Sequence, residues 1–144
     1  MKRLLLLFFL LMLSCSSPPR YNLDYGFGPC NKGLGWVDVS ISDSGIAKVV
    51  IKDLSLGQGK NYQLSKAQLM AIADTIEATH FFELNKSFVN KNVIGGNCVE
   101  LNINFEGRHN KIEVANTPVP DVKLIETAIV KELNSLDESW YKIK

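Results

Sequence analysis

The sequence contains few of the residues that build metal or catalytic centres. It has three cysteines and two histidines, and neither His80 nor His109 stands at metal-ligand spacing from a cysteine. The motifs of nucleophile elbows, zinc proteases and phosphate-binding loops are also missing. We therefore expect no bound metal, no cofactor and no catalytic residues.

An excess of charge of either sign is missing as well. The chain has 16 basic and 15 acidic residues, and they follow one another without a basic run. Nucleic-acid-binding domains carry a clustered basic surface that neutralises phosphates. The composition therefore argues against a nucleic acid as the partner.

The longest apolar run is too short to cross a membrane. It covers ten residues, 4–13, whereas a membrane-spanning helix needs about 20. Lys2 and Arg3 precede this run, and the small residue Ser14 ends it just before Cys15, which is the order of an export signal. The junction resembles the bacterial lipobox, in which cleavage before a cysteine leaves a residue that carries lipid.

This resemblance predicts a signal peptide over residues 1–14 and a lipid anchor on Cys15. Lipoboxes usually have Leu three residues before the cysteine, where this chain has Met12, so an ordinary secretory signal is the alternative. Ser16 after the cysteine resembles outer-membrane lipoproteins of bacteria with two membranes. We therefore expect a protein of the bacterial cell envelope that is attached to a membrane, the outer one in such hosts, through its lipid.

Residues 15–26 are predicted to form a tether and residues 27–144 a single folded domain. The tether contains Pro18 and Pro19, which favour extended polyproline geometry, and it has no apolar periodicity. Removal of the signal would leave a chain of the size of one ordinary domain.

Cys30 and Cys98 are the cysteines that remain for the domain if Cys15 carries lipid. An exported protein meets an oxidising compartment, so these two can form one disulfide. In the chain-entropy account, a loop of this length stabilises the fold by about 4 kcal/mol. The alternative is two separate thiols, one in a loop and one at the start of a strand.

Apolar and polar residues alternate on both sides of "SDSG" (42–45), which predicts a β-hairpin. A two-residue loop would set Val39 opposite Lys48. A three-residue loop sets Val39 opposite Val49, keeps one face apolar, and puts Gly45 where a left-handed residue is needed. A second hairpin is predicted around "EGRH", in which a type II′ turn at Gly107-Arg108 would set Ile103 opposite Ile112.

Two amphipathic helices complete the pattern. The first covers residues 65–78, where Ser65 and Gln68 have the spacing of a capping box. The second carries an apolar stripe from Val122 to Leu136, with Asp121 as its cap. Each main strand has one apolar face that two helices can cover. We therefore expect an α+β two-layer sandwich, in which an antiparallel sheet of four to five strands has two helices on one face.

The stretches "FGPCNKGLGWVDVSISDSG" and "LSKAQLMAIADTIEATHFFEL" resemble an uncharacterised domain family of bacterial exported proteins and lipoproteins. Its members combine a Pro-Cys, a strand ending in an Asp/Gly turn, and a Leu-Ser-x-x-Gln helix that leads into Phe-Phe-x-Leu. The family often has a second cysteine four residues after the first, where this chain has Leu34, so the resemblance leaves Cys98 as the partner of Cys30. It implies the fold and the location but no activity.

The polar face of the sheet is the first candidate binding surface. A tryptophan exposed among amides and charges is typical of contact surfaces for a polar ligand or a protein. The alternative is a solvated face, with the tryptophan covered by residues 25–29. Strand alternation assigns to this face Trp36, Asp38, Ser40, Lys48, Glu100, Asn102, Asn104 and Glu113.

The segment "NKSFVNKNVIGGN" (85–97) is the second candidate. Thirteen residues are long for a structureless connection in a compact domain. Phe88, Val93 and Ile94 could form a contact surface or fold down over the core.

These observations favour a non-catalytic, membrane-anchored domain that binds a protein or another envelope component. One alternative is an inhibitor or immunity-type module that blocks an envelope enzyme. Another is a cell-wall hydrolase that uses the sheet-face carboxylates Asp38, Glu100 and Glu113, because paired carboxylates can perform acid–base chemistry.

Overall fold

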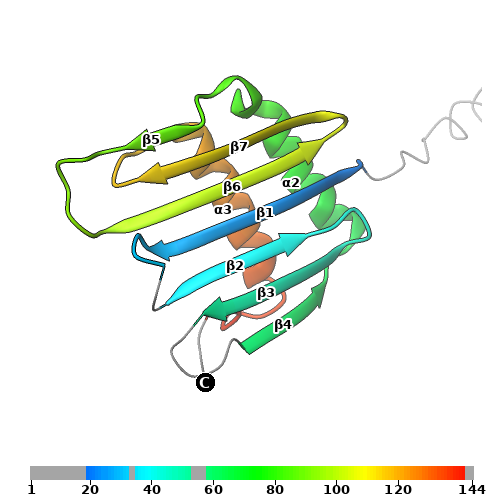
Figure 1. Ribbon diagram of the computed structural model, residues 1–144. Coiled ribbons are helices and arrows are strands. Elements are labelled where there is room, and N and C mark those ends of the chain that lie inside the picture. Colours follow the sequence, from blue (N-terminus) through cyan, green and yellow to red (C-terminus); the bar gives the residue numbers. More distant parts are fainter. Residues whose placement is uncertain (1–18, 33–34, 53–57, 142–144) are drawn as a thin grey trace, which may run out of the picture.

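The structure is a computed structural model, and it describes residues 19–32, 35–52 and 58–141. A seven-stranded sheet forms one layer, and its strands lie in the order β4-β3-β2-β1-β6-β7-β5 (Figure 1). All neighbouring strands are antiparallel except β5, which is parallel to β7. The strands are β1 (Tyr21–Pro29), β2 (Trp36–Ile41), β3 (Ile46–Lys52), β4 (Gln58–Gln63), β5 (Ser87–Val89), β6 (Asn97–Phe105) and β7 (Arg108–Ala115).

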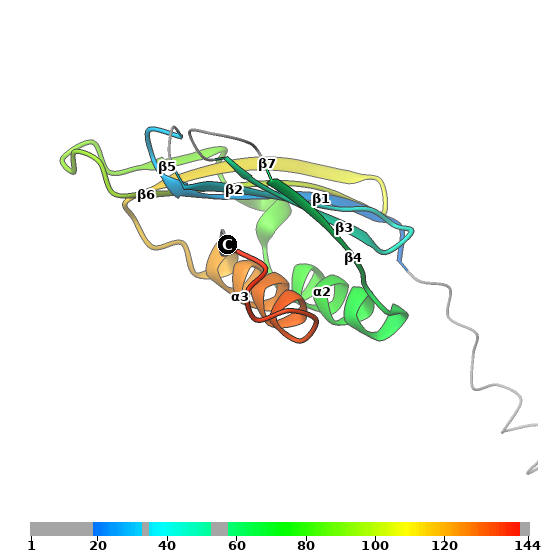
Figure 2. The same ribbon diagram turned by 90° about the horizontal axis from the view of Figure 1, so that it is seen from below.

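Two helices form the second layer. α2 (Lys66–Ala78) and α3 (Pro120–Asn134) lie on the same side of the sheet, as Figure 2 shows, and leave the other side uncovered. We call the uncovered side the outer face. The expected α+β two-layer sandwich is therefore confirmed, with more strands than the four to five that the pattern predicted.

The tether predicted over residues 15–26 is wrong in its second half. β1 begins at Tyr21 and pairs with β2 on one side and β6 on the other. Its alternate residues Tyr21, Leu23 and Tyr25 are buried between the sheet and the helices. Burial of three large side chains on one face of a strand favours pairing over a solvated extended chain. The folded domain therefore includes residues 21–26.

The first hairpin has the predicted register. Val39 pairs with Val49 and Ile41 with Ala47, around a loop that ends at Gly45 with φ 84°. That left-handed backbone is the one for which glycine has no steric penalty. Beyond this hairpin, β4 pairs with β3 and forms one edge of the sheet.

The second hairpin pairs two residues away from the predicted register. Ile103 lies opposite Asn110, and Phe105 lies opposite Arg108, so the two loop residues are Glu106 and Gly107. Both have positive φ, 46° and 80°. Two left-handed residues make a type I′ turn, whose twist matches the strands. The inward and outward faces are unchanged, because a shift of two residues preserves the alternation.

The helices keep their predicted apolar faces. The predicted cap is present on α2 but not on α3. α2 has the full capping box of Ser65 and Gln68. α3 begins with Pro120 after Val119, which makes no side-chain cap, so the cap predicted at Asp121 is wrong. The Asp121 carboxylate accepts a hydrogen bond from the backbone N–H of His80 instead. Leu136 lies beyond the end of α3 and is 41% exposed.

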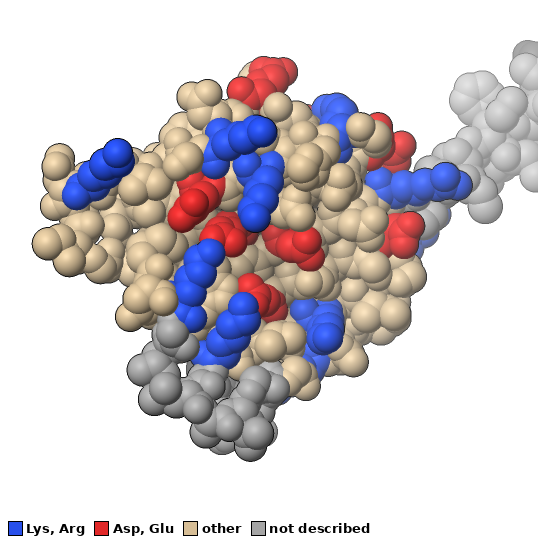
Figure 3. All heavy atoms as spheres, viewed as in Figure 1, with Lys and Arg blue, Asp and Glu red and all other residues tan. Residues whose placement is uncertain are grey.

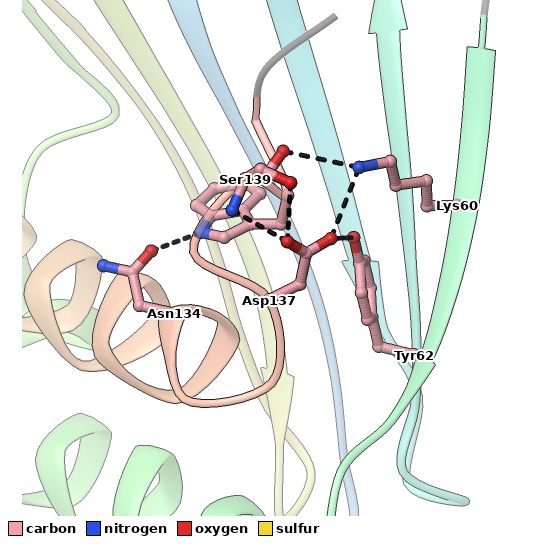
Figure 4. A network of polar contacts seen from close by, with 6 residues as sticks. Lys60, Tyr62, Asn134, Asp137 and Ser139 are labelled. Atoms are coloured by element: carbon pink, nitrogen blue, oxygen red, sulfur yellow. Dashed lines mark hydrogen bonds and ion pairs between the residues drawn. The ribbon is translucent and has the colours of Figure 1, made fainter. Parts of the chain in front are cut away.

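The C-terminal segment closes one side of the core. Trp140 is buried, packs edge-on against Phe27 at 5.9 Å, and donates from Nε1 to Asn134. Figure 4 shows how Asp137 fixes this segment to β4. Its Oδ2 accepts hydrogen bonds from Tyr62 Oη at 2.9 Å and Lys60 Nζ at 3.3 Å.

The same network shifts two pKa values. Hydrogen bonds from the hydroxyl and backbone N–H of Ser139, and from Tyr62, hold the pKa of Asp137 well below its usual range. Burial, with the hydrogen bond to Asp137, raises the pKa of Tyr62 to about 12. Asp137 is therefore an ionised hydrogen-bond acceptor at neutral pH.

Candidate binding site on the outer face

The outer face carries two rows of mainly polar residues that cross the central strands. Residues directly opposite one another in adjacent strands form each row, so the register determines its members. The first row consists of Lys48, Ser40, Asp24, Asn102 and Lys111, from β3 to β7. The second row consists of Val50, Asp38, Gly26, Glu100 and Glu113.

A hollow of about 360 Å³ lies where the two rows cross β1 and β2. Gly26 has no side chain and stands between Asp38 and Glu100 in its row, and its backbone, buried against Trp36, lines part of the hollow. The side chains around the hollow include Asp24, Asp38, Ser40, Lys48, Glu100, Asn102 and Lys111. Figure 3 shows the result, with acidic groups near the middle of the outer face and basic groups around them.

Trp36 faces outward as expected, but it is not an exposed binding residue. Its side chain is 2% exposed, because it packs over the bare backbone of Gly26 and Gly28 in β1. These glycines belong to residues 25–29, so the covered alternative is the correct one. The indole Nε1 donates to Asp38 Oδ1 at 2.7 Å, and Lys32 Nζ lies 5.1 Å from the ring centroid. Trp36 thus holds the Asp38 carboxylate through this hydrogen bond, and its own side chain is too deeply buried to contact a ligand.

Two of the acidic groups have cationic partners. Lys52 forms an ion pair with Asp38 at 2.6 Å, and Lys32 forms one with Glu100. The hydrogen bond to Glu100 is the main reason why the pKa of Lys32 is raised, and the nearby carboxylates act in the same direction. These lysines are substantially exposed, so each pair contributes little to stability. Their effect is to hold Asp38 and Glu100 at the rim of the hollow.

Asn102 links the middle of the hollow to β7. Its Nδ2 donates to Asp24 Oδ2 at 3.1 Å, and its Oδ1 lies 2.9 Å from His109 Nε2. Asn102 therefore orients the Asp24 carboxylate and occupies one of its two oxygens. The other oxygen, Oδ1, has no hydrogen bond to any residue that the structure describes.

Lys48 and Lys111 differ from the paired lysines. Both line the hollow, yet neither forms a hydrogen bond or an ion pair with the described residues. Lys111 and Glu100 also line a second hollow of about 450 Å³ toward Lys86 and Glu113. The polar surface therefore continues from the centre of the sheet toward β5.

Strand alternation in the sequence places Asp38, Glu100 and Asn102 correctly on this surface but misses Asp24, Gly26 and Lys111. The first two are missed because a tether over residues 15–26 leaves no room for β1. The alternation of Tyr21, Leu23 and Tyr25 is the signal that could have revealed this strand.

The second candidate, the segment 85–97, divides into two parts. Phe88 lies in β5, is half-buried and packs against the core, so it is not free for a partner. Val93 and Ile94 remain outside the core, and Ile94 is 101% exposed. The segment is also partly ordered by hydrogen bonds, because β5 pairs with β7 and Asn116 Nδ2 donates to Gly95 O at 2.7 Å.

The disulfide between Cys30 and Cys98 is confirmed. It joins the chain after β1 to the start of β6, where Gly28 pairs with Cys98. Cys98 is buried beside Trp36 and Ala115, so the bridge closes the end of the sheet next to the hollow. The cysteine proposed to carry lipid, Cys15, lies outside the described residues.

Further properties bear on the class of site. Within the parts of the chain that the structure describes, no three His, Cys, Asp or Glu side chains form a group that could hold a metal ion. In those same parts, no helix has both the length and the apolar character required to cross a membrane.

No protein-family model matches the chain, and no curated protein is significantly similar to it. The geometry of the outer face is therefore the basis on which a function can be proposed.

Proposed function

We propose that this chain is an exported, lipid-anchored protein of the bacterial cell envelope that binds a polar partner on its outer face and catalyses no reaction. The observation that carries the proposal is the hollow at Gly26. Charged side chains line it, and two of them, Lys48 and Lys111, have no partner among the described residues. Sites with few, well-placed polar groups around an opening are typical of ligand binding.

The anchor follows from the export-type start and Cys15. With β1 beginning at Tyr21, the tether shortens to residues 16–20. Five extended residues reach at most about 18 Å. An anchor on Cys15 would therefore keep the domain close to the membrane, with the turn at Glu106-Gly107 on the membrane side, because Tyr21 pairs with Phe105.

Binding is a better interpretation of the carboxylates than acid–base chemistry. Asp38 and Glu100 belong to one row but are separated by Gly26, and each already has a lysine partner. A general acid or base must instead direct its oxygen to the proton that it transfers. The cell-wall hydrolase therefore has less support than a binding protein.

A second candidate function is an inhibitor or immunity-type module, and one observation favours it. Ile94 stands fully exposed on a loop that hydrogen bonds hold to Asn116 and Cys30. A rigid loop with an apolar tip can fill a pocket of a partner enzyme, as the anchors of protein interfaces do.

The proposal is tested in the native host with two measurements. First, the intact mass of protein extracted from membranes should equal residues 15–144 plus acyl chains, less two hydrogens for the disulfide. Second, the double variant Lys48→Gln/Lys111→Gln should fail to complement a deletion strain. Lys131→Gln is the matched control, because Lys131 is exposed on α3, away from the outer face.

An unlipidated soluble chain would contradict the anchor. Full complementation by Lys48→Gln/Lys111→Gln would contradict the outer face as the binding surface. Loss of function by Ile94→Ala together with intact function of the lysine variant would favour the inhibitor module.

A further inference from the structure

We infer that the hollow at Gly26 binds a small zwitterion, namely a free amino acid or a short peptide with a free amino and a free carboxyl group. This inference rests on the proposed function and specifies its ligand. The ligand ammonium would bind Asp24, and the ligand carboxylate would bind Lys48 or Lys111.

Paired and unpaired charges stand side by side around the hollow. Asp38 and Glu100 have lysine partners, whereas Asp24 has only a neutral amide, that of Asn102. Lys48 and Lys111 have no partner among the described residues, although an uncompensated carboxylate lies in the same row. A ligand with both charges would satisfy the acid and a lysine together.

The spacing along the row suits a small ligand. Adjacent strands are about 4.8 Å apart, so the Cα atom of Asp24 lies roughly 10 Å from that of either lysine. Lysine side chains are long and flexible, and their ammonium groups can approach a ligand placed over Asp24. Ser40 lies between Asp24 and Lys48 and has a hydroxyl that can donate to the same carboxylate.

The charges around the hollow disfavour ligands that carry charge of one sign only. A polyanion placed there would meet Asp24, Asp38 and Glu100. A purely cationic ligand would meet Lys48 and Lys111 and would leave both without a counter-ion. Like charges in contact disfavour a partner, and opposite charges select it.

Asp24 is oriented before a ligand arrives. Asn102 Nδ2 holds one oxygen of its carboxylate, and His109 in turn lies within hydrogen-bond distance of Asn102. The free oxygen of Asp24 is therefore held in one orientation. A preorganised acceptor reduces the entropy that binding costs. The volume, about 360 Å³, lies at the small end of ligand pockets, as an amino acid or short peptide requires.

The test is calorimetric titration of the full-length protein in detergent at neutral pH. The probes are L-alanine, L-alanyl-L-alanine, its N-acetyl derivative and its C-terminal amide. We expect the two zwitterions to bind and each blocked dipeptide to bind about tenfold or more weakly, because each lacks one charge-assisted contact.

Two variants assign the contacts. Asp24→Asn should abolish the preference for the free over the acetylated dipeptide, because the carboxylate that recognises the ammonium is lost. Lys48→Gln/Lys111→Gln should abolish the preference over the amide. Lys131→Gln should change neither preference, and thermal unfolding of each variant verifies that it folds.

Equal affinity for free and blocked dipeptides would overturn the inference, and so would the absence of binding by both zwitterions at millimolar concentrations. The two proposals can fail separately. If neither zwitterion binds but Lys48→Gln/Lys111→Gln does not complement the deletion strain, the outer face binds a different partner and the proposed function stands. If that variant complements as well, both proposals fall.

Discussion

The indole of Trp36 lies against the bare backbone of Gly26, and a methyl group on that glycine would come within 2.7 Å of Trp36 Cζ2. The missing side chain therefore gives the tryptophan a place to pack on the outer face, beside the hollow that Gly26 helps to line.

Gly26→Ala is accordingly expected to displace Trp36 and to destabilise the fold by about 1–3 kcal/mol, the usual cost of overpacking. Chemical denaturation gives the free energy of unfolding, and fluorescence in a Trp140→Phe background reports the environment of Trp36. Gly59→Ala is the matched control on the same face, where the nearest atom to a new methyl group is Val49 O at 3.7 Å. Equal effects of the two alanines would contradict the packing.

Asn110 is a polar residue in an apolar position, 6% exposed and opposite Ile103. Its Nδ2 donates to Phe81 O at 2.8 Å and Leu84 O at 3.1 Å, which fixes the turn after α2 to β7. We expect Asn110→Ala to lower the free energy of unfolding by about 1–3 kcal/mol, because the carbonyls lose their donor.

Asn110→Asp provides the sharper test of this contact. This variant directs a carboxylate at carbonyl oxygens, so it should be less stable than Asn110→Ala at neutral pH. Its free energy of unfolding should rise as the pH falls and the carboxylate is protonated. The control is Asn104→Ala, an exposed amide on β6 whose loss should be nearly neutral. An aspartate variant as stable as the native protein would contradict the donor role.

Asp137 makes stability depend on pH at the acid end. Its pKa is lower in the folded protein than the ordinary value of 3.8, so its ionised form stabilises the fold above that pH. This stabilisation is lost as the pH falls from about 4 toward the lower folded pKa. The difference in unfolding free energy between native protein and Asp137→Asn should be constant from pH 5 to 7 and shrink below about pH 4.

Urea unfolding at a series of pH values measures that difference. Asp74→Asn, an exposed carboxylate on α2, is the control, and its difference from the native protein should be small at every pH. A difference for Asp137→Asn that grows as the pH falls would show that the ionised carboxylate does not stabilise the fold.

The disulfide is expected to stabilise the domain by up to about 4 kcal/mol, because it closes a long loop in the unfolded chain. Cys30→Ala/Cys98→Ala removes it without leaving a free thiol. Denaturation of this variant should match that of the reduced native protein. A loss of less than about 1 kcal/mol in the free energy of unfolding would mean that residual pairing of β1 with β6 already restricts the unfolded chain.

The first hairpin was predictable because its information is local. Gly45 and the alternation around it leave one register with an apolar face. The second hairpin offers the same local information, but two glycine-containing turns preserve its apolar face. The twist of a type I′ turn favours the pair Glu106-Gly107, and this turn requires a left-handed glutamate that no local pattern predicts.

The hollow could not be predicted in the same way, because its parts come from remote strands. Asp24 meets Asn102 only through the pairing of β1 with β6, and Trp36 finds its cover only on β1. With residues 15–26 assigned to a tether, the contact of Asp24 with Asn102 cannot be inferred, whereas the cover of Trp36 by residues 25–29 was one of two alternatives that the sequence left open. When a central strand is missed in the sequence, the cross-strand contacts on both of its sides are missing from the prediction.

The position of β1 has a mechanical consequence. The chain enters the domain at Tyr21 and runs at once along the middle of the sheet, with nine residues paired to β6 and five to β2. Tension applied through the preceding segment would pull this strand lengthwise and load both ladders in shear. An edge strand such as β4, pulled in the same direction, would load only its one ladder to β3. A pull from the N-terminal side of the domain thus acts on a strand that two ladders hold.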